Sequence, residues 1–126
     1  MKKRIIIVDD HKIIRDGLNA TFKNNHVLEV VADFDNEDDL FNFLKTSSTD
    51  LILMDLHLNS ANGLELTKRS KMEYPDVKVV MHTISDSEDN VEEAKKIGAE
   101  GYVLKSGGQK KLEEALYMVL SGQNYY

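Results

Sequence analysis

Short runs of apolar residues alternate along this chain with stretches in which apolar residues recur every three or four positions. A short β-branched run is typical of a strand buried on both faces, and the wider spacing is typical of an amphipathic helix. The pattern therefore predicts five strands, each followed by a helix. The predicted strands are 5–8, 27–31, 51–54, 77–81 and 102–104.

The predicted helices have recognisable ends. Asn36 precedes a run of acidic residues, which is typical of the start of a helix, and Gly98 is well placed to end a helix over about 86–97. Segment 121–126 is expected to leave the last helix without joining another element. The clearest helical stripe lies in that last helix and consists of Leu112, Ala115, Leu116, Val119 and Leu120.

Strand and helix thus alternate five times without an internal repeat or an interdomain linker. This order favours the α/β class, with a doubly wound parallel sheet, helices on both faces and right-handed crossovers. The chain has 126 residues and a mass of 14.3 kDa, which suits a single domain. We therefore expect one domain over 1–126.

Composition narrows the function classes. A net charge of −6 argues against a non-specific nucleic-acid binder, and the absence of cysteine excludes disulfides, thiolate metal sites and cysteine nucleophiles. The apolar run behind Met1 is too short for an export signal, and no stretch approaches the roughly 18 apolar residues of a membrane span. These features predict a soluble cytoplasmic protein with no membrane partner.

Polar side chains follow each of the five predicted strands. In a doubly wound sheet, ligands bind beyond the carboxyl ends of the strands, so these residues are the candidates for chemistry. Asp33, after the second strand, is set aside because an edge strand lies away from the crevice. The candidates are Asp9, Asp10 and His11 after the first strand, Asp55 and His57 after the third, Thr83 after the fourth and Lys105 after the fifth.

Three carboxylates that converge on one crevice repel one another. At about 4 Å each pair costs roughly 4 kcal/mol with an effective dielectric constant of about 20, so the group must take up a proton or a cation. Hard oxygen ligands suit Mg²⁺, and a carboxylate beside Mg²⁺ can attack phosphorus. Lys105 would oppose the charge of a phosphoryl group, and Thr83 would donate a hydrogen bond to it. The residues therefore suit formation of an aspartyl phosphate.

In this order and at these strand ends, Asp9-Asp10, Asp55, Thr83 and Lys105 resemble the receiver domain of bacterial two-component response regulators. The resemblance covers essentially the whole chain and implies the flavodoxin-like fold, with strand order 2-1-3-4-5 and five helices. Further motifs are similar to the subfamily with a C-terminal helix-turn-helix, the LuxR/NarL-like regulators. They are Asp9-Asp10-His11 with Arg15 and Gly17-Leu18, the segment from Gly98 to Lys105, and Gly122 with Tyr125.

The resemblance implies a ligand set for Mg²⁺ and an acceptor for phosphate. Asp55 would accept a phosphoryl group from the phosphohistidine of a sensor histidine kinase. Asp10 and Asp55 would bind Mg²⁺ directly, Asp9 mainly through water, and the backbone carbonyl of His57 would complete the protein ligands.

The resemblance also implies a switch. Lys105 would pair with the phosphoryl group, Thr83 would move toward it, and Tyr102 would turn inward, although an aromatic residue in a short strand is also compatible with simple packing. Three positions depart from the common family pattern: Asn59 stands where proline is frequent, Ile84 where a small residue is frequent, and Ser106 where proline often follows the lysine.

The implied partners are a histidine kinase and a transcription-regulating output domain outside this chain, through which alone DNA would be contacted; a homodimer is left open. The chain would not be an enzyme beyond assisting its own phosphorylation and dephosphorylation. The main alternative is a Mg²⁺-dependent phosphatase with an aspartyl-phosphate intermediate, although such hydrolases usually place Asp-x-Asp after the first strand. A flavin-binding module and a zinc site of His11, His57 and His82 are weaker alternatives.

Overall fold

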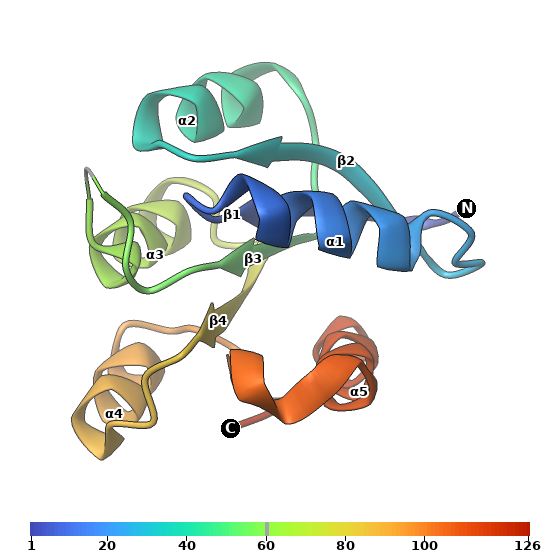
Figure 1. Cartoon of the computed structure of the whole chain (residues 1–126). Coiled ribbons are helices and arrows are strands. Elements are labelled where there is room, and N and C mark those ends of the chain that lie inside the picture. The colour runs from blue at the N-terminus through green and yellow to red at the C-terminus, as the bar shows by residue number, and fades with distance from the viewer. Residues whose placement is uncertain (60) are drawn as a thin grey trace.

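The computed structural model describes residues 1–59 and 61–126, and in it strands and helices alternate along the chain (Figure 1). The elements are β1 (Lys3–Val8), α1 (Lys12–Phe22), β2 (Leu28–Phe34), α2 (Glu37–Thr46), β3 (Leu51–Met54), α3 (Gly63–Glu73), β4 (Lys78–Thr83), α4 (Glu88–Lys96), β5 (Gly101–Leu104), a 3₁₀ turn (Lys105–Gly107) and α5 (Gly108–Leu120).

The five strands form one parallel sheet in the order β2-β1-β3-β4-β5, as expected. After β1 the chain first adds β2 on one side and then β3 on the other, so the order reverses between β1 and β3. Val8 pairs with Met54 in the register of these two strands. The residues that follow them, Asp9 and Asp55, therefore emerge side by side at the switch point where such sheets bind ligands.

The continuous apolar runs arise because both faces of the central strands are covered. Ile6, Ile52 and Met54 belong to one core, which also includes residues of α2, α3 and α4. Ile5 and Leu53 belong to a second core, which includes residues of α1 and α5. Figure 1 shows the two helix layers on opposite sides of the sheet. A strand between two layers has no solvent face, so the polar and apolar alternation of a half-exposed strand is absent.

Local signals set the helix ends as predicted. The side chain of Asn36 accepts a hydrogen bond from the backbone N–H of Asp39, at 2.9 Å, and so caps α2. Gly98 has φ of 98°, a left-handed conformation that favours glycine, and it follows α4. No helix within the described ranges is long and apolar enough to cross a bilayer.

The expectation for the C-terminal segment was wrong, because this segment joins the sheet edge. The backbone N–H of Tyr102 donates to the carbonyl of Tyr125 at 2.8 Å, and the N–H of Tyr125 donates to the carbonyl of Glu100 at 2.9 Å. The hydroxyl of Tyr126 donates to the carbonyl of Ala99. The outer edge of β5 would otherwise present unpaired N–H and C=O groups, and the segment pairs with them in parallel.

Candidate functional site

The carboxyl ends of β1 and β3 bring three aspartates together. Ligand atoms of Asp9, Asp10, His11 and Asp55 all lie within 4.8 Å of one another. Asp9 and Asp55 are almost fully buried, with 2% and 4% of their surface exposed. The predicted convergence of the three carboxylates at one crevice is therefore confirmed, and the group is one that could hold a metal ion.

Lys105 joins this cluster from the end of β5. Its Nζ lies 2.7 Å from Asp9 Oδ2 and 3.2 Å from Asp55 Oδ2. Burial works against the charge of this lysine, but the hydrogen bond to Asp9 and the negative charges of Asp55 and Asp9 outweigh it. The pKa of Lys105 is therefore raised, and the ammonium group stays charged between the two carboxylates.

A single lysine does not neutralise the cluster. Burial is the largest cause that raises the pKa of Asp55, and the negative charge of Asp9 raises it further. Lys105 and the backbone N–H of His57 lower this pKa only in part. The ionised form of Asp55 is thus held in an unfavourable environment, and another positive charge in the crevice would stabilise it.

Asp10 supplies a second indication of a cation site. Its Oδ1 is buried and accepts no hydrogen bond from the residues that the structure describes. His11 Nδ1 lies 3.1 Å from this oxygen, but not in the geometry of a hydrogen bond. A buried carboxylate oxygen without a donor is costly unless a cation contacts it. The oxygen donors of this site therefore fit a hard divalent cation such as Mg²⁺.

The loop after Asp55 is tied back onto its own strand end. The N–H of His57 donates weakly to Asp55 Oδ1, at 3.3 Å, and His57 pairs with Asn62 in an antiparallel bridge. The side chain of Asn62 caps α3 by accepting from the N–H of Leu64 at 2.8 Å. Because Gly63 has no Cβ, α3 can begin in contact with the backbone of Asp55. The backbone of His57 is thus held beside the acidic cluster, while its side chain is exposed.

Thr83 and Tyr102 both form hydrogen bonds with the backbone of a third residue, Ser85. Thr83 is buried at the end of β4, and its hydroxyl oxygen accepts a hydrogen bond from the N–H of Ser85 at 3.2 Å. The Tyr102 hydroxyl donates to the carbonyl of Ser85 at 2.8 Å, and only 5% of Tyr102 is exposed. The ring is therefore inward in this structure, and a change of its position on phosphorylation stays a prediction.

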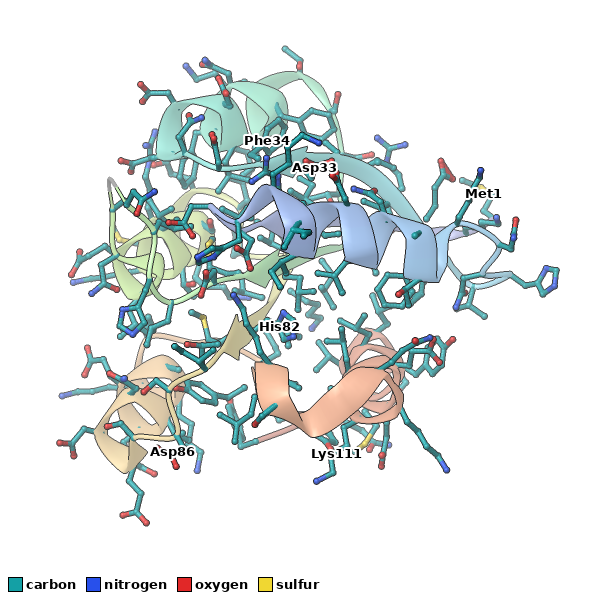
Figure 2. The ribbon with its side chains drawn as sticks, viewed as in Figure 1. Met1, Asp33, Phe34, His82, Asp86 and Lys111 are labelled. Carbon is teal, nitrogen blue, oxygen red and sulfur yellow. The ribbon has the colours of Figure 1, made fainter. Side chains whose placement is uncertain are left out.

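Of the three histidines considered for zinc, His11 alone belongs to the metal-capable group found among the described residues. The side chain of His57 is exposed, and His82, labelled in Figure 2, is buried on β4 beneath a groove lined by Leu18, Leu112 and others from α1 and α5. Burial, with the nearby charge of Lys105, lowers the pKa of His82 to about 4. A three-histidine site is not assembled.

Arg15 was considered only as part of a family motif, and Asp33 was set aside, but the structure connects both to the cluster. Arg15 Nη1 donates to the backbone carbonyl of Asp9 at 2.6 Å, and its Nε donates to Asp33 Oδ1 at 2.8 Å. Asp33 does stay outside the group of possible metal ligands. Its contact with the site runs through Arg15, which no spacing of carboxylates along the sequence would indicate.

Comparison with known proteins agrees with this geometry. Residues 5–117 match the response regulator receiver domain family. The chain belongs to this family. The chain is also similar to part of two transcription regulators. It is 36% identical over 124 residues to transcriptional regulatory protein DegU of Brevibacillus brevis, and the match covers 98% of this chain and 52% of DegU. It is 34% identical to transcriptional regulatory protein ComA of Bacillus subtilis, over 96% of this chain and 58% of ComA. The chain thus spans about half the length of the curated relatives it matches.

Solved structures show the same fold. A two-component response regulator of the LuxR family from Aurantimonas sp. aligns with a TM-score of 0.93 and 26% identity, over 100% of this chain and 90% of that one. The isolated receiver domain of RcsB from Salmonella enterica serovar Typhimurium aligns with a TM-score of 0.90 over 100% of this chain and 94% of that one, and its 24% identity supports the fold alone. The receiver fold and the resemblance to LuxR/NarL-like regulators are therefore confirmed.

Proposed function

We propose that this receiver domain is a Mg²⁺-dependent switch that accepts a phosphoryl group on Asp55 from a sensor histidine kinase. The observation that carries the proposal is the arrangement around Lys105, whose Nζ lies within 3.2 Å of oxygens on Asp9 and Asp55. Beside this pair, the buried Oδ1 of Asp10 has no hydrogen-bond donor among the described residues. This arrangement suits one cation and one phosphoryl group at the same crevice.

Asp10 and Asp55 would hold Mg²⁺ directly, Asp9 mainly through water, and the His57 backbone carbonyl would complete the protein ligands. When bound, Mg²⁺ supplies positive charge that offsets the carboxylates and the phosphoryl oxygens. The tie between His57 and Asn62 supports this assignment, because it holds the backbone of His57 close to Asp55.

Asp55 acts as the nucleophile. One of its carboxylate oxygens forms a bond to phosphorus, and the bond from phosphorus to the histidine nitrogen of the kinase breaks, so that the imidazole leaves with the electron pair. Lys105 can then pair with a phosphoryl oxygen, since its Nζ already contacts Asp55 Oδ2. Its raised pKa keeps it charged for this role.

Thr83 and Tyr102 would transmit a conformational change from the phosphoryl group to the surface of the domain. If Thr83 turns its hydroxyl toward the phosphoryl group, its bond with the N–H of Ser85 is lost. Ser85 also accepts the hydroxyl of Tyr102, so a shift of Ser85 would reach the ring of Tyr102. A covalent modification at Asp55 would in this way shift the population of a bistable element.

The names of related proteins support a proposal for the wider role of this domain. DegU and ComA are named as transcriptional regulatory proteins, and one RcsB structure is described as dimers bound to DNA. We propose that this receiver domain acts in the cytoplasm, controls a transcription-regulating output domain and meets DNA only through such a domain. Self-association as a homodimer belongs to the same proposal.

Beryllofluoride, a mimic of the phosphoryl group, tests the acceptor. With Mg²⁺ present, the wild-type chain is expected to bind beryllofluoride, and Asp55→Asn is expected not to bind it, as followed by ¹⁹F and amide NMR. Asp16→Asn is the matched control, because Asp16 is an exposed carboxylate on α1 that does not belong to the group of possible metal ligands. If Asp55→Asn binds as well as the wild type, Asp55 is not the acceptor. Repeated turnover of a small phosphomonoester would instead support the phosphatase alternative.

A further inference from the structure

Besides Lys105, the guanidinium of Arg15 also contacts the β1–α1 turn, which it reaches from helix α1. Only 13% of its side chain is exposed, although it belongs to the first turns of a surface helix. The guanidinium lies against the end of β1 and donates in two directions, to the Asp9 carbonyl at 2.6 Å and to Asp33 Oδ1 at 2.8 Å. A planar guanidinium can make both bonds at once, and an ammonium group cannot match that fork.

The carbonyl that Arg15 contacts belongs to the peptide group between Asp9 and Asp10. The rotation of that peptide group sets the directions in which the two carboxylates leave the backbone. Asp9 is held at other points as well, since its N–H donates to the carbonyl of Phe34 at 3.0 Å and its Oδ1 accepts the N–H of His11 at 2.9 Å. Asp10 Oδ1 has no such support among the described residues. The placement of Asp10 therefore depends on the peptide group that Arg15 holds.

Asp33 and Asn19 hold Arg15 in turn. Asp33, labelled in Figure 2, lies near the end of β2 beside α1, and its Oδ2 accepts a hydrogen bond from Asn19 Nδ2 at 3.1 Å. The same Asn19 amide nitrogen donates to the backbone carbonyl of Arg15 at 2.9 Å. The hydrogen bonds of Arg15, Asn19 and Asp33 thus connect α1, the turn after β1 and the edge strand β2.

We propose that Arg15 is a positioning residue, which holds the Asp9–Asp10 peptide in the orientation that binds the divalent cation. The inference rests on the Mg²⁺ site of the proposed function. Partners that orient metal ligands without touching the metal typically change affinity by about 10- to 100-fold when they are removed. Because Arg15 acts through one peptide group, a loss of about tenfold in Mg²⁺ affinity is expected for Arg15→Gln.

Electrostatics alone predicts that loss of the Arg15 charge strengthens Mg²⁺ binding, whereas the positioning role predicts weaker binding. This difference makes the proposal testable. Removing the charge of Arg15 leaves Asp33 without its cationic partner and makes the surroundings of the site more negative. By Coulomb attraction such a change would tighten the binding of Mg²⁺. Weaker binding by Arg15→Gln can therefore not be attributed to the lost charge.

The experiment compares Mg²⁺ affinities of the whole chain by calorimetry, with amide NMR of residues 9–11 and urea unfolding of each variant alongside. Lys12→Gln is the matched control, since it removes the same charge from the same helix and its partner Asp16 is exposed. We expect Lys12→Gln to bind Mg²⁺ as the wild type does or slightly more tightly. Arg15→Lys keeps the charge and loses the fork, so it should bind between the wild type and Arg15→Gln, and it provides the test if Arg15→Gln does not fold.

The outcomes separate the two proposals. If the wild-type chain binds no Mg²⁺, the proposed function fails and the inference fails with it. If the wild type binds Mg²⁺ and both Arg15 variants bind as tightly as Lys12→Gln, the role of Arg15 is overturned and the proposed function stands. Weaker binding by both Arg15 variants, with shifted amide signals at Asp10 and His11 in folded protein, supports the positioning role.

Discussion

At the scale of single residues, burial decides which groups around the site carry charge. Lys105 stays charged because two carboxylates outweigh its loss of hydration, while Asp55 is pushed toward its neutral form by burial and by Asp9. His82 on the neighbouring strand is kept neutral, because burial and the charge of Lys105 both disfavour the imidazolium. Each charge state therefore follows from neighbours that are distant in sequence.

His82 makes folding sensitive to acid. Its pKa is about 4 in the folded chain, against an ordinary value of 6.5, so the unfolded chain binds a proton more readily. The neutral form contributes stability above pH 6.5, and this contribution is lost as the pH falls toward 4. A difference of about 2.5 pH units corresponds to about 3 kcal/mol. His82→Gln is expected to flatten the fall in unfolding free energy over this range, measured by urea titration at several pH values.

Exposed His26 provides the control for this measurement. His26→Gln should leave the slope of unfolding free energy against pH unchanged. The slopes are compared rather than the absolute stabilities, because a buried amide at position 82 brings its own cost. An unchanged slope in His82→Gln would contradict the assignment.

At the scale of elements, α3 and β3 approach each other more closely than any side chain would allow. A Cβ built on Gly63 would lie 1.9 Å from the backbone oxygen of Asp55. The contact places the first residue of α3 against the backbone of Asp55. A glycine here is required by the close approach of two backbones.

Replacing Gly63 and Gly17 by alanine should change the unfolding free energy in opposite directions. Gly63→Ala forces backbone atoms apart and is expected to destabilise the fold by about 3 kcal/mol or more. Gly17 lies within α1, and a Cβ added there would meet no atom within 4 Å, so Gly17→Ala should stabilise by about 0.5–1 kcal/mol. Urea unfolding of both variants measures the difference. Equal effects would mean that the approach of α3 to Asp55 is less close than described.

At the scale of the whole molecule, the acidic cluster opposes folding, and a bound cation would reduce the repulsion among its carboxylates. The cluster draws its residues from two strand ends, so it exists only in the folded chain. Repulsion among its carboxylates is therefore a cost of the native state, and a ligand that binds only this state stabilises it.

Mg²⁺ should raise the unfolding free energy of the wild-type chain by about 2.7 kcal/mol when its free concentration is about 100 times Kd. Asp10→Asn removes one ligand and one charge, so it should be more stable than the wild type without Mg²⁺ and should gain little from its addition. Thermal or urea unfolding with and without Mg²⁺ measures both effects. Asp16→Asn should respond to Mg²⁺ as the wild type does, and an equal response in Asp10→Asn would exclude Asp10 as a ligand.

The pattern of apolar residues was sufficient to predict the strands, the helices and the doubly wound sheet. Burial on both faces imposes continuous apolar runs, and the helix caps at Asn36 and Gly98 act through neighbours in sequence. Asp9, Asp10, Asp55 and Lys105 were expected to meet because they follow strands of a doubly wound sheet, and the family motifs then implied the strand order. These predictions succeeded because each depends on local pattern or on the ends of adjacent strands.

Other features were decided only when the chain folded. The pairing of Tyr125 with β5 uses backbone hydrogen bonds, which leave no side-chain pattern in the sequence. The contact of Arg15 with Asp33 depends on how α1 lies over the sheet, and the neutral state of His82 depends on burial beside Lys105. Sequence alone therefore determined which elements form and which acids gather, because periodicity and strand order carry that information. The tertiary structure decided what holds and neutralises those acids, because directions and desolvation exist only after packing.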